Sequence, residues 1–329
     1  VSVKTSKLRV SKEACYALLS RIYLYMEENE KVVEIANKIK GYSLANLNAF
    51  SPISNFASMN LTETIFSQGP YVMFNIHGTE VEQWVDKQID FAYLRETGKI
   101  RYILTYRKEH YDCSYAVSDD LANLYDANDS RLSVFFKRGE FTGNLFCRKY
   151  RGARPGAPEL DPVTRDTMPD YNKETAAGSY GWVRYGEVIL NKAEAQAYLG
   201  DPNVAETLQK FLETRYKVVP EIPTTGKELV EFIRRERRKE LCFEGHRWFD
   251  LKRYAVHSQY PEKISVKHEW HEIELDNSGY RVAVVGGVNV LEPYSEHSQG
   301  MWMLPIPDEV IDFCQGNMVN APREGVQRN

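Results

Sequence analysis

Residues 234–250 bring acids, bases and aromatic rings together closely enough to do chemistry, in the order RRERRKELCFEGHRWFD. These residue types serve three different kinds of site. A run of arginines and lysines binds the phosphates of nucleic acids, and a pair of carboxylates carries out acid–base catalysis. A buried network of ion pairs instead holds helices together without any chemistry. The spacing of the charges decides among the three.

Charged residues occupy helix positions that the apolar pattern marks as buried. Leu229 and Ile233 define the buried face of a helix, and the same face continues through Glu236, Arg237 and Glu240. Arg237 and Glu240 are three residues apart, a spacing that brings opposite charges together on a helix. Because a buried charge is costly unless it is paired and hydrogen-bonded, the pattern favours a structural ion network.

Three residues just beyond this helix are expected to complete the network. Gly245 permits a sharp turn of the backbone, and Arg247 and Asp250 follow it. The many nearby arginines would keep the carboxylates ionised and so unfit as general acids, and the acids match the bases, unlike in a phosphate-binding arm. We therefore predict no catalytic residue here. The predicted structural signature comprises Glu236, Arg237, Glu240, Gly245, Arg247 and Asp250.

The composition is that of an ordinary globular protein, with 329 residues, 43% of them hydrophobic, and a net charge of −4. The slight acidity argues against nucleic acid as a partner, and no apolar run is long enough to span a membrane. The five cysteines show no CxxC pairing, so neither a disulfide framework nor a zinc site is supported, and we expect buried thiols. No cofactor is indicated. These cysteines are Cys15, Cys113, Cys147, Cys242 and Cys314.

The hydrophobic periodicity predicts a mainly α fold, built as a tetratricopeptide-like scaffold of helical hairpins with a loop-rich, partly β ligand-binding part. We expect one domain over residues 1–329. A helical hairpin is predicted for 11–41, and a loop-rich part with short strands for 42–178. Further helical hairpins, including the charged stretch, are predicted for 179–255, and a second loop-rich part with short strands for 256–329.

Several local elements are predicted within these parts. Residues 100–106 alternate between apolar and polar side chains, which is typical of a strand, and residues 131–149 could form a hairpin around Arg138-Gly139-Glu140. Helical spacing resumes at Trp182 and should stop at Gly200.

The charged stretch also carries a family resemblance. Residues 236–254, ERRKELCFEGHRWFDLKRY, closely resemble the signature of the SusD/RagB family. Four further stretches agree in order. DSRL at 129–132 resembles the family's DPRL, and KY at 149–150 matches a KY that follows it. VRYGEVILNKAEA at 183–195 resembles the helix LRYAEVLLNYAEA, and LPIPDEV at 304–310 resembles PIPxxEI.

The resemblance implies a surface lipoprotein of Bacteroidota that is tethered to the outer membrane by a lipid anchor. Such proteins cap a TonB-dependent transporter of the SusC type and capture oligosaccharides, or peptides in some members, without chemistry. Members usually carry a signal peptide, a lipidated cysteine and a long portion before the helix that we place at Ser11. None is found in this sequence, so we expect an N-terminal portion to be missing. The end, 317–329, also lacks the usual NPGY-like close.

Exposed aromatic rings flanked by polar residues are the best candidates for binding a sugar, because they stack on its apolar C–H face. Two polar stretches of the loop-rich part supply such residues. The candidates are Trp84, Tyr111, Asp112 and Tyr115. Packing within the loops is the alternative for each of them. Trp182, Trp248 and Trp302 lie within family motifs, and we assign them to the core.

Other patterns point to no further site. His268-Glu269-Trp270-His271-Glu272 is not the metal-binding motif HExxH, and on a strand its two histidines would face opposite sides. Gly286-Gly287 is expected to form a turn. Three alternatives to oligosaccharide capture remain: a peptide-capturing protein, a glycoside hydrolase with two carboxylates across a groove, and a scaffold that binds only other proteins.

Overall fold

A computed structural model describes the greater part of the chain. The described residues are 7–50, 56, 61–68, 85–89, 102–106, 117–138, 145–147, 149, 180–275, 281–302 and 327–328. They fall into two compact units, Val1–Phe243 and Glu244–Asn329, and each is described by itself. The assignment of 1–329 to a single domain stays a prediction. None of the described helices combines the length and the apolar character needed to cross a membrane.

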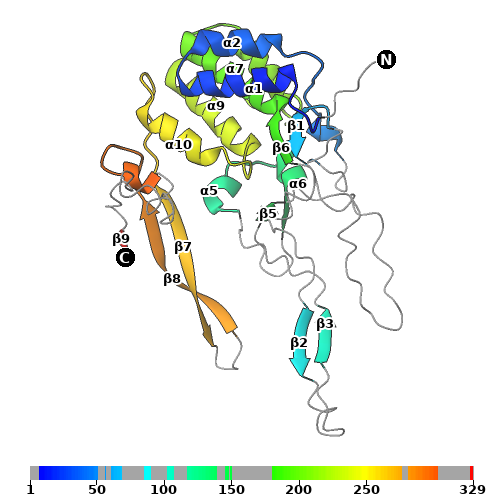
Figure 1. The fold of residues 1–329 in the computed structure, drawn as a ribbon, viewed down its shortest axis with the longest axis vertical. Coiled ribbons are helices and arrows are strands. Elements are labelled where there is room, and N and C mark those ends of the chain that lie inside the picture. The colour runs from blue at the N-terminus through cyan, green and yellow to red at the C-terminus, as the bar shows by residue number, and fades with distance from the viewer. Residues whose placement is uncertain are drawn as a thin grey trace, which may run out of the picture. The chain divides into compact units, whose positions relative to one another are not determined.

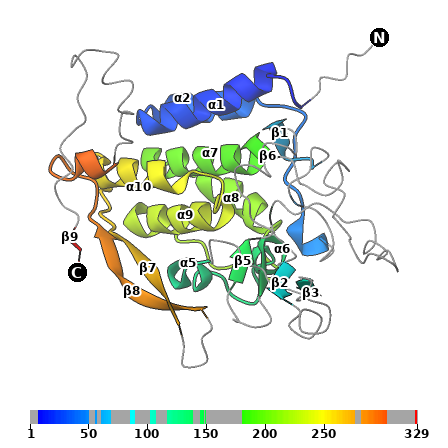
Figure 2. The same ribbon diagram turned by 60° about the horizontal axis from the view of Figure 1, so that its bottom comes forward.

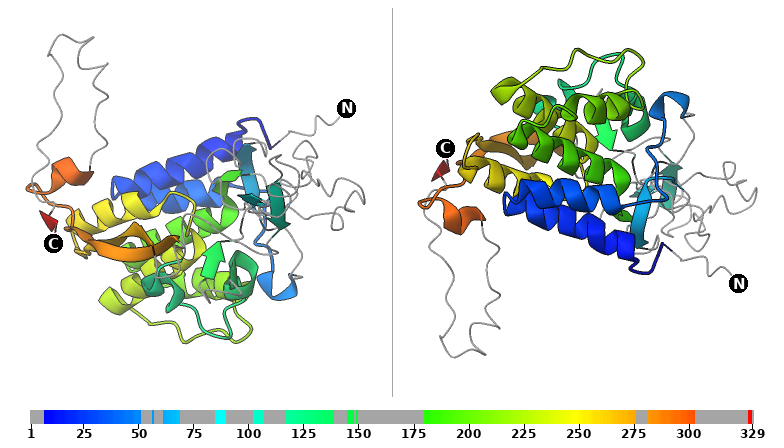
Figure 3. Two further views of the ribbon diagram at one scale, coloured as in Figure 1. Left: turned by 90° about the horizontal axis from the view of Figure 1, so that it is seen from below. Right: turned by 90° about the horizontal axis from the view of Figure 1, so that it is seen from above.

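The first unit is built around five helices. Helix α7 contacts α1, α2, α8 and α9, and α1 and α2 pair as an antiparallel hairpin. Figure 2 shows α1 and α2 as a layer on one side of α7, with α8 and α9 on the other, and Figure 3 shows the same stack from above and below. This confirms the mainly α fold with a helical-hairpin scaffold. The five helices are α1 (Lys12–Tyr25), α2 (Asn29–Lys38), α7 (Tyr185–Leu199), α8 (Val204–Leu212) and α9 (Gly226–Glu240).

The first hairpin forms for the reasons that its sequence suggests. The Ser11 side chain caps α1 by accepting a hydrogen bond from the Ala14 backbone N–H at 3.1 Å. Small buried residues such as Ala14 and Ala17 let the neighbouring helices approach closely. Helix α2 ends at Lys38, so Gly41, with φ +83°, lies in the following turn rather than directly at the helix end.

A strand, rather than the predicted start of a helix, precedes α7. Strand β6 (Tyr180–Arg184) pairs antiparallel with β1 (Thr64–Gln68), and α7 begins only at Tyr185. The bulky and β-branched pair Trp182-Val183 suits an extended backbone. Trp182 is 38% exposed, so its assignment to the core was wrong. The predicted stop is confirmed, because Gly200 ends α7 in the left-handed conformation with φ +66°.

Short elements complete the first unit. The predicted strand near 100–106 is confirmed as β3 (Tyr102–Tyr106), which pairs with β2 (Val85–Ile89). The predicted hairpin forms between β4 (Phe136–Arg138) and β5 (Leu145–Cys147). Residues 131–135, expected as part of that hairpin, instead form helix α6. The remaining elements are α5 (Asp119–Ala122), α6 (Arg131–Phe135) and the 3-10 turn η1 (Leu47–Ala49).

The second unit contains a helix and a three-stranded sheet. Its elements are α10 (Arg247–Val256), β7 (Val266–Leu275), β8 (Arg281–Leu291), the 3-10 turn η2 (Gln299–Trp302) and β9 (Gln327–Arg328). Figure 1 shows β7 and β8 as a long hairpin, where only short strands were expected. Gly286 does not form a turn with Gly287; it lies within β8 at an irregularity in the pairing, opposite Trp270 and His271.

Tryptophans and cysteines separate into core and surface positions. Trp302 is buried, its ring centroid lies 4.6 Å from that of Trp248, and its indole N–H donates to the Glu292 carbonyl at 2.9 Å. The core assignment of Trp302 is therefore confirmed. Cys147 and Cys242 are buried as expected, whereas Cys15 is exposed on α1, contrary to the prediction of a buried thiol.

Candidate functional site

The four ligand-binding candidates lie outside the residues that the structure describes. Trp84 immediately precedes β2, and Tyr111, Asp112 and Tyr115 lie between β3 and α5. Their role in binding stays a prediction. The described residues present two other features built from polar side chains, a buried ion network and an open groove.

Glu240, the last residue of α9, is the centre of the ion network. Its Oε1 accepts hydrogen bonds from Arg184 Nη1 at 2.6 Å and from Arg215 Nη2 at 2.9 Å. Its Oε2 accepts from Arg215 Nε at 2.9 Å and more weakly from Arg131 Nη1 at 3.4 Å. All four side chains are buried. The carboxylate thus joins the end of β6, the turn after α8, and α6 to the end of α9.

Further carboxylates neutralise the same arginines. Glu63 lies 3.1 Å from Arg184 Nη1 and 2.7 Å from Arg215 Nη2. Asp129 binds Arg131 through two hydrogen bonds of 2.8 and 2.7 Å. Arg131, Arg184 and Arg215 therefore each have at least two carboxylate partners, the condition under which a buried charge is tolerated.

Glu236 extends the network by one helical turn. Its Oε2 accepts from Arg131 Nη2 at 2.6 Å, and its Oε1 lies 2.5 Å from Lys239 Nζ and accepts from the Tyr216 hydroxyl at 2.8 Å. The Glu236–Lys239 pair follows from their three-residue separation on α9. Lys149 closes the end of the helix by donating to the carbonyls of Glu240 at 2.7 Å and Cys242 at 3.0 Å.

The electrostatics of this cluster keep its central carboxylate ionised. Burial would by itself raise the pKa of Glu240, but the adjacent charges of Arg215 and Arg184 together outweigh burial. The pKa is consequently held well below its ordinary value of 4.5. A buried carboxylate that stays ionised at neutral pH cannot donate a proton to a substrate. The geometry fits a structural role for Glu236 and Glu240.

The predicted signature contains four further residues, Arg237, Gly245, Arg247 and Asp250. Arg237 is buried and donates to Asn191 Oδ1 of α7 at 2.6 Å. Gly245 adopts the left-handed conformation with φ +79°, as a sharp turn requires. In the second unit, Asp250 accepts from Arg253 at 2.9 Å, and Arg247 is half-buried at the start of α10. That Arg247 and Asp250 complete the network stays a prediction.

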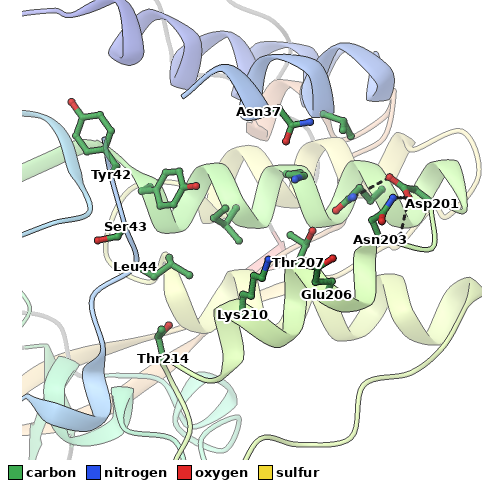
Figure 4. A pocket seen from close by; sticks show the side chains of 15 residues that line it. Asn37, Tyr42, Ser43, Leu44, Asp201, Asn203, Glu206, Thr207, Lys210 and Thr214 are labelled. Atoms are coloured by element: carbon green, nitrogen blue, oxygen red, sulfur yellow. Dashed lines mark hydrogen bonds and ion pairs between the residues drawn. The ribbon is translucent and has the colours of Figure 1, made fainter. Parts of the chain in front are cut away.

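An open groove of about 630 Å³ lies between α2, α7 and α8 of the first unit. Figure 4 shows Asn37 of α2 facing Thr207 and Lys210 of α8, with Tyr42 at one end and Asp201 at the other. Tyr185 and Lys192 of α7 also line it. No pattern in the sequence indicated this groove, because its walls come from segments far apart in the chain.

Comparison with known proteins identifies the chain. Residues 160–323 match the model of the SusD family. The chain belongs to the SusD family. A curated relative, SusD-like protein P38 from Formosa agariphila, is 39% identical over 138 residues, which are 36% of this chain and 27% of the relative.

Solved structures of other SusD-like proteins share the fold. A SusD-like carbohydrate binding protein from Bacteroides vulgatus is 19% identical, with a TM-score of 0.55 over 96% of this chain and 61% of its own. Surface glycan-binding protein A from Bacteroides uniformis is 16% identical, with a TM-score of 0.55 over 95% of this chain and 61% of its own. This chain therefore spans somewhat less than two thirds of these structures.

Three residues of α7 differ from the SusD family motif LRYAEVLLNYAEA. Ile189 replaces one aliphatic side chain by another, and the structure shows where the other two departures lie. Gly186 stands where the motif has alanine, and a Cβ there would lie 2.8 Å from both Arg184 Nη1 and Glu63 Oε2 of the ion network. Lys192 stands where the motif has tyrosine, and it lines the groove. One departure thus belongs to the buried network and the other to the groove.

Sequence reasoning missed most partners of the SusD-family signature. Arg131 and Arg184 lie inside stretches that resemble family motifs, so the resemblance could have indicated them. Glu63 and Arg215 carry no such signal, because Glu63 precedes a short strand and Arg215 follows α8. Only the tertiary structure brings those two side chains to Glu240.

Proposed function

We propose that this protein captures oligosaccharides at the bacterial cell surface and delivers them to a SusC-like TonB-dependent transporter without chemical change. Membership of the SusD family carries this proposal. Support comes from structures of the same fold whose names describe carbohydrate or glycan binding. The proposed location is the outer membrane, by way of a lipid anchor. Peptide capture is the alternative ligand class.

The ion network supports a role without catalysis. A glycoside hydrolase needs two carboxyl groups that face each other across a substrate groove, one of them protonated. Glu240 and Glu236 are buried away from solvent and lie against arginine and lysine side chains. Neither can reach a polysaccharide, and arginines hold the pKa of Glu240 well below its ordinary value. These carboxylates stabilise the scaffold instead.

Trp84, Tyr111, Asp112 and Tyr115 are the proposed ligand-binding residues, because they combine aromatic faces with hydrogen-bonding groups. Affinity electrophoresis of the full chain in gels containing different polysaccharides tests this. We expect at least one polysaccharide to retard the protein. Replacing Trp84, Tyr111 or Tyr115 by alanine should weaken the retardation, because each ring contributes stacking area.

The control is Phe249→Ala, which removes an aromatic ring that is 54% exposed on α10, away from the candidate residues in sequence. It should leave the retardation unchanged. Failure of every polysaccharide to retard the chain, while a peptide library binds, would establish the peptide-capturing alternative and overturn the proposal.

A further inference from the structure

We infer that the groove between α2, α7 and α8 is a second saccharide-binding site, separate from the loop aromatics, and that it takes an uncharged oligosaccharide. The inference rests on the proposed function for the class of ligand. Its location comes from the structure, since the groove lies mainly on the helical scaffold, and only Tyr42, Ser43 and Leu44 come from the start of the loop-rich part.

The dimensions of the groove suit a short oligosaccharide. Its volume of about 630 Å³ lies within the range of roughly 300–1,000 Å³ that is typical of small-molecule sites. Three helices form most of its walls, and α7 packs against both α2 and α8. A site on packed helices holds its polar groups in fixed positions, which lowers the entropic cost of binding.

Two tyrosines supply apolar surface and hydrogen-bonding hydroxyls. Tyr42 and Tyr185 both line the groove, and both are half-buried. Burial raises the pKa of each phenol, so the hydroxyls stay protonated and uncharged. A tyrosine ring packs against the C–H face of a sugar, and its hydroxyl can hydrogen-bond at the edge. The Tyr42 hydroxyl also has a hydrogen bond with the Ser11 side chain.

The charges that line the groove balance. The acidic residues are Asp201 and Glu206, and the basic ones are Lys192 and Lys210. Asp201 accepts from the Asn203 backbone N–H at 2.9 Å, and Glu206 pairs with Lys210 at 2.5 Å. A lining with no net charge favours a neutral ligand over an anionic or cationic one.

Lys192 is the strongest single indication of a ligand. It is half-buried in the middle of α7, and within the described part of the chain it makes no hydrogen bond or ion pair. Its charge contributes to the lowered pKa of Asp201, after the hydrogen bonds from Asn203 and Gln196. The ammonium therefore lies near the acid without contacting it, and its three donors can reach the hydroxyl and ring oxygens of a sugar.

The family motif has a different residue at the position of Lys192. Lys192 replaces the tyrosine of LRYAEVLLNYAEA, so the cation in the groove is a feature of this chain and not of the motif. If the lysine served only to stabilise α7, the adjacent acids would be expected to bind it directly. The structure instead engages both acids with other partners.

The test uses the full chain with Trp84, Tyr111 and Tyr115 all replaced by alanine, which removes the loop candidates. Calorimetry with a panel of neutral trisaccharides measures what binding remains. We expect one of them to bind, and adding Lys192→Gln to weaken that binding at least about tenfold, because hydrogen bonds from charged donors are strong. Lys227→Gln, on an exposed position of α9 outside the groove, is the matched control.

Hydroxyl-radical footprinting supplies the second readout. The trisaccharide should protect Tyr42 and Tyr185 from oxidation in the wild-type chain, and the protection should fade in Lys192→Gln. Circular dichroism checks that Lys192→Gln remains folded. The inference is overturned if both tyrosines stay unprotected, if Lys192→Gln binds as tightly as its parent, or if only charged oligouronides or peptides protect the groove.

The same measurements separate this inference from the proposed function. If the wild-type chain binds saccharide but the triple alanine variant does not, the groove site is wrong and the proposed function stands. If no saccharide binds to the wild-type chain, the proposed function falls and the groove site falls with it.

Discussion

At the scale of single residues, Glu240 accepts hydrogen bonds from three arginines that belong to three separate segments. Replacing it by glutamine removes the charge but keeps the size, and it leaves these guanidinium groups buried beside one another. We expect Glu240→Gln to lower the free energy of unfolding by about 3–5 kcal/mol, measured by denaturant titration. Glu206→Gln is the control, because its pair with Lys210 is exposed. Similar effects of the two variants would contradict a structural network.

The lowered pKa of Glu240 also makes stability depend on pH. A carboxylate whose pKa is lower in the folded state stabilises the fold above its unfolded pKa, and this contribution disappears as the pH falls toward the folded pKa. We expect the free energy of unfolding to fall as the pH drops below about 4.5. The fall should be shallower in Glu240→Gln, and parallel pH profiles of the two proteins would count against this assignment.

How much of the network the sequence could predict depends on the distance between partners in the chain. The pair Glu236–Lys239 follows from helical spacing and is present at 2.5 Å. The same rule pairs Arg237 with Glu240, and that pair stays a prediction. The structure shows Arg237 donating to Asn191, and Glu240 accepting from Arg184 and Arg215. Helical spacing identifies neighbours on one helix. Arg184 and Arg215 instead belong to the end of a strand and to a turn, so the spacing on α9 could not indicate them.

At the scale of elements, the two ends of α7 depend on glycine for different physical reasons. At the start, a Cβ on Gly186 would lie 2.8 Å from Arg184 Nη1 and Glu63 Oε2, too close for the network to stay in place. At the end, Gly200 has open space around it but adopts φ +66°, which an L side chain rarely adopts. Packing therefore requires the glycine at position 186, and backbone conformation requires the glycine at position 200.

Gly186→Ala should therefore destabilise the protein by about 1–3 kcal/mol through crowding of the ion network. Gly200→Ala should cost about 1–2 kcal/mol through backbone strain. Thermal unfolding measures both effects. Combining each substitution with Glu240→Gln separates the causes, because only the Gly186→Ala effect should be non-additive with it. Additive behaviour of both would indicate that Gly186 does not act through the network.

The elements were predictable where a local pattern dominates. The helical periodicity predicted the hairpin that begins with α1, and Gly200 predicted the end of α7. The start of α7 was not predictable from periodicity, because Val183 keeps the helical spacing while its backbone pairs with β1. The groove carried no signal for the same reason, since its lining is assembled by packing from α2, a turn, α7 and α8.

At the scale of the whole molecule, the balance of charges bears on what the protein does to its ligand. The chain has 46 acidic residues, so composition alone leaves room for a hydrolase. The signature acids Glu236 and Glu240 are buried in the helical scaffold, and each is paired with a cationic side chain. If either of them acted as a general acid, the ion network that joins the helices would have to break. The same carboxylates therefore cannot both stabilise the fold and carry out catalysis.

We accordingly expect capture without turnover. The chain should retard a polysaccharide in affinity electrophoresis and release no new reducing ends from it over a day between about pH 5 and pH 8, the range in which a glycosidase acid would work. A reducing-sugar assay on the retarded polysaccharide measures this, with an added glycosidase as the positive control. Release of reducing ends by the purified chain, abolished by replacing an acid outside the network, would show that catalytic carboxylates lie elsewhere in the protein.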